Sequence, residues 1–125
     1  MTLREKVSAQ EFSVATGRNP EDIREAGQRA AEAGARFLES TVVEHQIADS
    51  AINYVVNGPG GFVQKMDLTV RWETTGNGQR RVSLEGGDFM TDRMVLWGFI
   101  PIGPKSVTAM GSLKRFAARL RKELS

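Results

Sequence analysis

The 125-residue sequence contains no cysteine and only one histidine, His45. The absence of cysteine excludes disulfides, thiolate metal sites and cysteine nucleophiles, and it fits a reducing compartment. With one imidazole, a transition-metal site would need carboxylates for its remaining ligands, which is a poor set for zinc. We therefore expect neither a metal nor another cofactor.

Long apolar runs are also missing. No stretch approaches the ~20 apolar residues of a membrane-spanning helix, and residues 1–6 lack the apolar run of a signal peptide. Hydrophobic residues make up 40% of the chain and charged residues 26%, a composition typical of a folded globular protein. We expect a single domain over residues 1–125, located in the cytoplasm.

The net charge is only +2, but it is unevenly placed. Residues 105–125 hold six Lys or Arg against one Glu, whereas residues 1–104 hold eleven against fourteen Asp or Glu. Such a basic end favours contact with nucleic acid or another acidic partner. Positive residues near a helix C-terminus also complement the helix dipole without any partner. The candidate contact residues are Lys114, Arg115, Arg119 and Lys122.

A helix is predicted over residues 20–39. Asn19 is a good N-cap, and Pro20 suits the first helical position. The middle of its apolar face is built from small residues, which either allow close packing on a sheet or leave room for a ligand. These small residues are Gly27, Ala30 and Gly34.

A closing helix is predicted over residues 107–124, with Ser106 or Thr108 as its cap. The preceding Gly103–Ser106 segment, with Lys105, offers amides for an anion, but we expect helix capping to account for it. The helix presents an apolar arc that is expected to cover a sheet face. The arc consists of Met110, Leu113, Phe116, Ala117, Leu120 and Leu124.

Alternating apolar and polar residues predict an antiparallel meander between the two helices, because short turns join only antiparallel neighbours. One further strand, in residues 7–15, is expected before the first helix, and Gly86–Gly87 suggests a bulge or the end of a strand. The class is therefore α+β, with five to six strands in the order β-α-β(4-5)-α. The meander strands are predicted in residues 41–57 (two strands meeting near Asp49–Ser50), 62–73, 80–85 and 94–100.

The segment 94–100 is predicted as one strand that is apolar on both faces. Met94, Leu96 and Ile100 would line one face, and Val95, Trp97 and Phe99 the other. Exposing two large aromatic rings to water would be unfavourable by several kcal/mol. Both faces must therefore be covered, by another element, a ligand or a partner chain.

A sheet curved around the closing helix would enclose an apolar pocket for a small hydrophobic ligand, lined by Tyr54, Met66, Trp72 and Trp97. This arrangement is similar in outline to helix-grip folds, which bind hydrophobic ligands between sheet and helix. A homodimer that buries the same apolar face is the alternative use. The leading hypothesis is a non-enzymatic binding module.

An enzymatic role ranks last among these hypotheses. His45 is expected on one strand face with Val43 and Ile47, at the rim of the core. Asp88 and Asp92 follow two glycines and could serve acid–base chemistry at the sheet end. No G-x-S-x-G nucleophile elbow is present.

Overall fold

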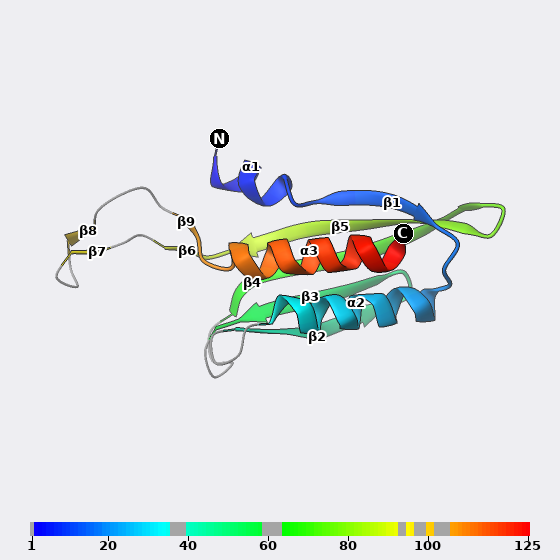
Figure 1. The fold of residues 1–125 in the computed structure, drawn as a ribbon, viewed down its shortest axis with the longest axis horizontal. Coiled ribbons are helices and arrows are strands. Elements are labelled where there is room, and N and C mark those ends of the chain that lie inside the picture. Colours follow the sequence, from blue (N-terminus) through cyan, green and yellow to red (C-terminus); the bar gives the residue numbers. More distant parts are fainter. Residues whose placement is uncertain (1, 36–39, 59–63, 93–94, 97–99, 102–105) are drawn as a thin grey trace.

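The computed structural model describes residues 2–35, 40–58, 64–92, 95–96, 100–101 and 106–125 (Figure 1). Its main sheet is antiparallel, with the strand order β1-β5-β4-β3-β2. The helices are α1 (Leu3–Ser8), α2 (Pro20–Gly34) and α3 (Met110–Leu124). The strands of the main sheet are β1 (Phe12–Thr16), β2 (Thr41–Ala48), β3 (Ala51–Asn57), β4 (Gln64–Gly76) and β5 (Gln79–Phe89).

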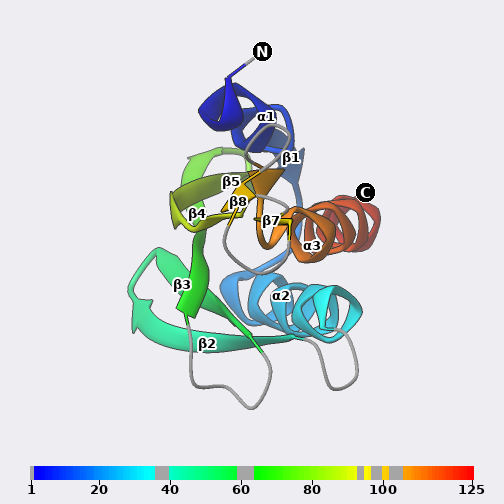
Figure 2. The same cartoon turned by 90° about the vertical axis from the view of Figure 1, so that its left-hand side faces the viewer.

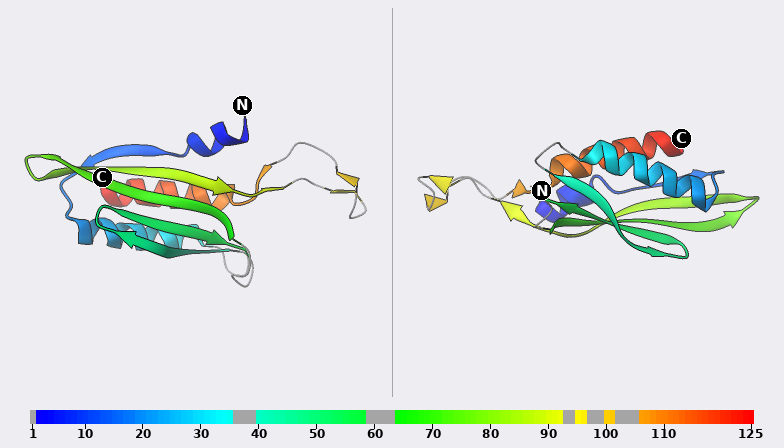
Figure 3. Two further views of the ribbon diagram at one scale, coloured as in Figure 1. Left: turned by 180° about the vertical axis from the view of Figure 1, so that it is seen from behind. Right: turned by 90° about the horizontal axis from the view of Figure 1, so that it is seen from below.

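Both long helices, α2 and α3, cover the same face of this sheet (Figures 1 and 2). We call this face the inner face and the opposite one the outer face. In the view from behind, the strands lie in front of the helices (Figure 3). The predicted α+β class and the predicted order of elements are confirmed. Among the described residues, no helix is both long and apolar enough to cross a membrane.

Local sequence signals explain where these elements begin and turn. The Asn19 side chain accepts a hydrogen bond from the Asp22 amide at 2.8 Å, and Pro20 occupies the first turn of α2. Asn77 and Gly78 form the two-residue hairpin between β4 and β5 with φ of 52° and 74°. Such left-handed values are what the Asn-Gly pair favours in tight hairpins.

Three predicted boundaries are corrected. Residues 3–8 form α1, capped by Thr2, and only residues 12–16 form the first strand. Helix α2 ends at Gly34, because Ala35 is extended, rather than running to residue 39. Helix α3 follows Ala109, which makes no side-chain cap hydrogen bond, so the predicted capping by Ser106 or Thr108 is wrong.

The predicted bulge at Gly86–Gly87 is confirmed. Leu68 pairs with Gly86 while Met66 pairs with Phe89, so the β5 segment has one more residue than the β4 segment opposite it. Gly86 allows α1 to approach, because a Cβ there would lie 2.6 Å from Val7 Cγ1. The Arg4 guanidinium donates to the carbonyls of Gly86 and Gly87 at 2.7 and 2.8 Å, which holds α1 on this bulge.

The single strand predicted over residues 94–100 is wrong. The structure instead pairs β7 (Val95–Leu96) with β8 (Ile100–Pro101) antiparallel, so these residues belong to neighbouring strands. Another short ladder joins β6 (Thr91–Asp92) to β9 (Ser106–Val107), and these pairs lie beyond the end of the main sheet (Figure 1). A run of apolar residues shows the same sequence pattern whether it forms one continuous strand or two short strands that fold back on each other. Outside the described residues lie Met94, Trp97, Phe99 and, from the predicted anion-binding segment, Gly103 and Lys105.

Candidate functional site

The residues predicted to line an apolar pocket lie in the hydrophobic core. Tyr54 and Met66 are at most 1% exposed and Trp72 is 8% exposed, all between the inner face and the two helices. The ring of Tyr54 packs against Phe116 of α3, with centroids 5.1 Å apart. This is the space in which helix-grip proteins hold a ligand, and here the buried rings of Tyr54 and Phe116 occupy part of it. Trp97, the fourth predicted residue, lies outside the described residues.

The Tyr54 hydroxyl explains one of the small residues in α2. A Cβ at Gly27 would lie only 2.0 Å from the Tyr54 oxygen, so glycine leaves the room that this hydroxyl occupies. The oxygen is buried and has no hydrogen-bond partner among the described residues. Burial raises the pKa of the Tyr54 phenol well above its ordinary value, and the nearby Glu44 carboxylate adds to this. Tyr54 is therefore a neutral core residue at physiological pH.

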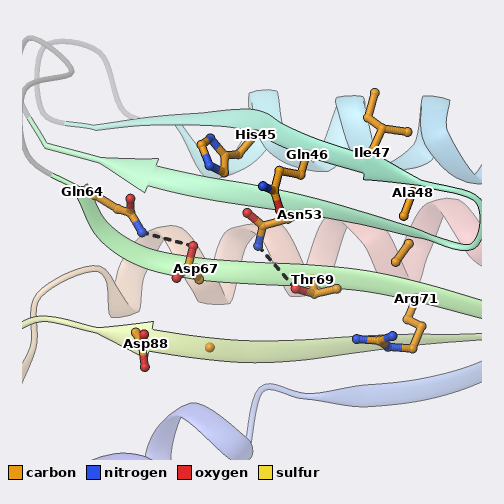
Figure 4. A pocket seen from close by; sticks show the side chains of 12 residues that line it. His45, Gln46, Ile47, Ala48, Asn53, Gln64, Asp67, Thr69, Arg71 and Asp88 are labelled. Carbon is orange, nitrogen blue, oxygen red and sulfur yellow. Dashed lines mark hydrogen bonds between the residues drawn. The ribbon is translucent and has the colours of Figure 1, made fainter.

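The outer face carries a separate, broad cleft of about 900 Å³. It extends across β2 to β5, and most of the side chains that line it are polar (Figure 4). We call it the outer cleft. Its lining residues are His45, Gln46, Ile47, Ala48, Ala51, Asn53, Gln64, Asp67, Thr69, Arg71, Gly87 and Asp88.

Sheet register brings these polar residues together, because alternate residues of adjacent strands share a face. Asn53 pairs with both Gln46 and Thr69 across the ladders. The Asn53 amide nitrogen donates to Leu68 O at 3.1 Å and to Thr69 Oγ1 at 3.4 Å. These bonds hold the amide in place in the middle of the cleft.

Charged groups lie on either side of this centre. Gln64 donates to the Asp67 carboxylate at 3.1 Å, and Arg71 lies 3.6 Å from the Glu85 carboxylate. Asp88, a candidate from the sequence, lines the same cleft as Asp67. In the sequence these residues appear only as the solvated side of their strands. The sequence does not show that their side chains line a common cleft.

His45 also lines the outer cleft. A β-bulge between Glu44 and Gln46 interrupts the regular alternation of β2. Of the expected row of Val43, His45 and Ile47, both His45 and Ile47 line this cleft. Glu44 faces α2, where its carboxylate accepts hydrogen bonds from the Arg24 guanidinium at 3.0 and 3.2 Å. Within the part of the chain that the structure describes, no three His, Asp or Glu side chains cluster to hold a metal.

The basic residues of α3 have differing surroundings. Arg115 donates to Gly34 O at 3.0 Å and so satisfies a carbonyl at the end of α2. Arg119 donates to the Glu123 carboxylate at 2.8 Å, and Arg29 of α2 donates to the same carboxylate at 3.2 Å. Lys114 and Lys122 are exposed. Of the four predicted nucleic-acid contacts, Arg115 therefore links α3 to α2 and Arg119 pairs within α3. A nucleic-acid role for this surface stays a prediction.

The ion pairs of Glu123 give α3 a defined response to acid. Hydrogen bonding from Arg119 lowers the pKa of the Glu123 carboxyl from its ordinary value, although partial desolvation opposes the shift. A carboxyl with a lowered folded-state pKa stabilises the fold above its unfolded pKa and loses that effect as the pH falls through the folded value. We expect Glu123→Gln to flatten the loss of stability that occurs as the pH falls from the unfolded-state pKa of a glutamate, about 4.3, through the lower folded-state value.

Urea unfolding at several pH values measures this effect. The control is Glu32→Gln, which removes one exposed carboxylate from α2. If Glu123→Gln and Glu32→Gln lose stability with acid equally, the paired carboxylate of Glu123 has no special role.

Fold and site together define an α+β protein in which two helices cover one face of the sheet and a polar cleft lies on the other. Comparisons with protein-family models, with curated proteins and with solved structures found no match for this chain.

Proposed function

We propose that the protein is a non-enzymatic binding module that holds a small polar molecule in the outer cleft. The observation that supports this most is the hollow itself. Its volume of about 900 Å³ lies within the range of small-molecule sites, which is roughly 300–1,000 Å³. The cysteine-free sequence fits a reducing compartment, so we propose that the protein acts in the cytoplasm.

The lining favours a ligand that donates hydrogen bonds. Asp67 and Asp88 offer carboxylate oxygens, and the Asn53 nitrogen already donates within the sheet, which leaves its oxygen as the acceptor for a ligand. Hydrogen bonds to ionised acceptors are about twice as strong as neutral ones. Hydroxyl or amino groups are therefore the expected recognition elements. The apolar ligand predicted from Tyr54, Met66 and Trp72 would first have to displace their core packing.

Filling the centre of the cleft tests this proposal. Thr69→Arg places a long charged side chain beside Asn53, whereas Thr74→Arg makes the same change at an exposed position of β4 outside the cleft. Ligand-observed NMR with a library of sugars, amino acids and polyamines screens for binding. We expect Thr69→Arg to weaken the binding of any detected ligand by about tenfold or more, and Thr74→Arg to leave its affinity unchanged.

Native mass spectrometry of the unmodified protein and of the Thr69→Arg and Thr74→Arg variants separates the competing uses of the outer face. A dimer without adduct that Thr69→Arg dissociates would replace the ligand with a second copy of the chain. Binding of DNA that falls steeply with salt, and that Lys114→Glu or Lys122→Glu removes, would shift the function to α3. Absence of any library hit would contradict the proposal.

A further inference from the structure

A second, smaller cleft of about 150 Å³ lies where the first turn of α3 meets the start of β4. It shares no lining residue with the outer cleft, so a ligand bound here is independent of the proposed function. Two basic side chains, Lys65 and Arg115, line it together with the hydroxyl-bearing Ser40, Thr108 and Ser112. None of the described residues that line it carries a carboxylate. We call it the basic cleft.

Hydrogen bonds hold three of the polar residues of the basic cleft, Ser40, Ser112 and Arg115, in place. The Ser40 and Ser112 hydroxyl oxygens lie 3.0 Å apart within hydrogen-bond distance, and Ser112 is only 4% exposed. Arg115 is oriented through one nitrogen, Nη2, which donates to Gly34 O at 3.0 Å and approaches Ser112 Oγ at 3.4 Å. A guanidinium carries five N–H donors, so this anchoring leaves others for a ligand.

The backbone of Gly111 lies close to the Arg115 guanidinium. A Cβ at Gly111 would lie 3.2 Å from Arg115 Nη1, so the absence of a side chain lets Arg115 lie over the first turn of α3. That turn has no side-chain cap, and its amides add partial positive charge to the two cations. The two cations and the hydroxyls, with no carboxylate among the described lining residues, form a potential that attracts an anion.

We propose that the basic cleft binds a phosphate group, either as inorganic phosphate or as the terminal phosphate of an ester. The cleft volume suits one such tetrahedral group and little more. Lys65 supplies a point charge, Arg115 a charged planar donor, and the serine and threonine hydroxyls neutral donors, which together match the oxygens of a phosphate.

Titration with sodium phosphate, followed by the amide signals of Gly111 and Ser112 in ¹H–¹⁵N NMR spectra, tests the proposal. Sodium chloride at equal ionic strength serves as the reference. We expect saturable shifts with phosphate alone, and a Kd that rises about tenfold in Lys65→Gln. Lys122→Gln removes the same charge from the far end of α3 and should leave the Kd unchanged, while Lys65→Arg should retain binding.

Three results would overturn the proposal: no saturable shift in the unmodified protein, equal shifts with chloride, or equal weakening by Lys65→Gln and Lys122→Gln. The last two results would mean that anions screen the charge of a basic surface without binding at a specific site. A parallel titration with methyl phosphate separates the two sources of the group. Tighter binding of methyl phosphate supports a phosphate ester as the natural ligand, and tighter binding of the free ion supports inorganic phosphate.

Discussion

Replacing Gly27 with alanine is expected to lower the free energy of unfolding by about 2 kcal/mol. The direction of this change in stability distinguishes Gly27 from an ordinary helix glycine. A glycine inside a helix normally disfavours the helix by about 1 kcal/mol relative to alanine, so the same change at an unobstructed position stabilises. At Gly27 the new methyl group would lie 2.0 Å from the buried Tyr54 oxygen, and α2 would have to move away from the sheet. Overpacking of this kind typically destabilises by about 1–3 kcal/mol.

Tyr54→Phe should relieve much of this effect. The Tyr54 hydroxyl is buried without a partner among the described residues, so removing it breaks no observed hydrogen bond and leaves one fewer unsatisfied polar group. We expect Tyr54→Phe alone to be neutral or slightly stabilising, and Gly27→Ala to be milder when it is combined with Tyr54→Phe. The relief will be partial, because a Cβ at Gly27 would still lie 3.0 Å from the ring carbon that bears the hydroxyl.

Urea unfolding of the four proteins in this double-mutant cycle gives the coupling energy, which we expect to be about 1 kcal/mol. Gly111→Ala is the matched helix-glycine control, since a Cβ there would meet only the far end of the flexible Arg115 side chain. Additive effects of Gly27→Ala and Tyr54→Phe would show that the hydroxyl is not what limits the approach of α2.

The sequence predicts the small-residue face of α2 correctly as a close-packing surface, but it cannot predict what the surface packs against. Gly27 and Tyr54 are 27 positions apart in the sequence and meet only because β3 lies under α2. Helix periodicity and strand alternation are local signals, so they identify which residues face inward. They do not show whether inward-facing residues such as Tyr54 line a cavity or pack against one another.

The outer cleft fails to emerge from the sequence for a related reason. Residues such as Asn53, Thr69 and Arg71 have the pattern of the solvated side of ordinary strands, and one face of an antiparallel sheet is commonly solvated. Their grouping depends on register, and the bulges of β2 and β5 alter that register locally. The basic cleft is harder still to foresee, because Ser40, Lys65 and Arg115 come from three separate parts of the chain.

Phe116→Ala is expected to have the largest effect on stability, about 3–5 kcal/mol. Phe116 is fully buried and packs its ring against Tyr54, so alanine would leave a void between α3 and the inner face. Losing this amount from a domain whose whole stability is typically about 5–15 kcal/mol would bring the protein close to unfolding. Urea unfolding with an unchanged m-value measures the loss, and Phe116→Leu should lose much less because it keeps most of the buried volume.

The same variant tests whether the core of the native protein is full. Apolar cavities made by truncating large side chains stay dry and can bind benzene. Benzene should therefore raise the melting temperature of Phe116→Ala and leave that of the unmodified protein unchanged, because in the latter the Phe116 ring fills the space beside Tyr54. Equal stabilisation of both proteins would mean that an apolar site already exists between sheet and helices, and the hydrophobic ligand predicted from Tyr54, Met66 and Trp72 would then take precedence over a polar ligand in the outer cleft.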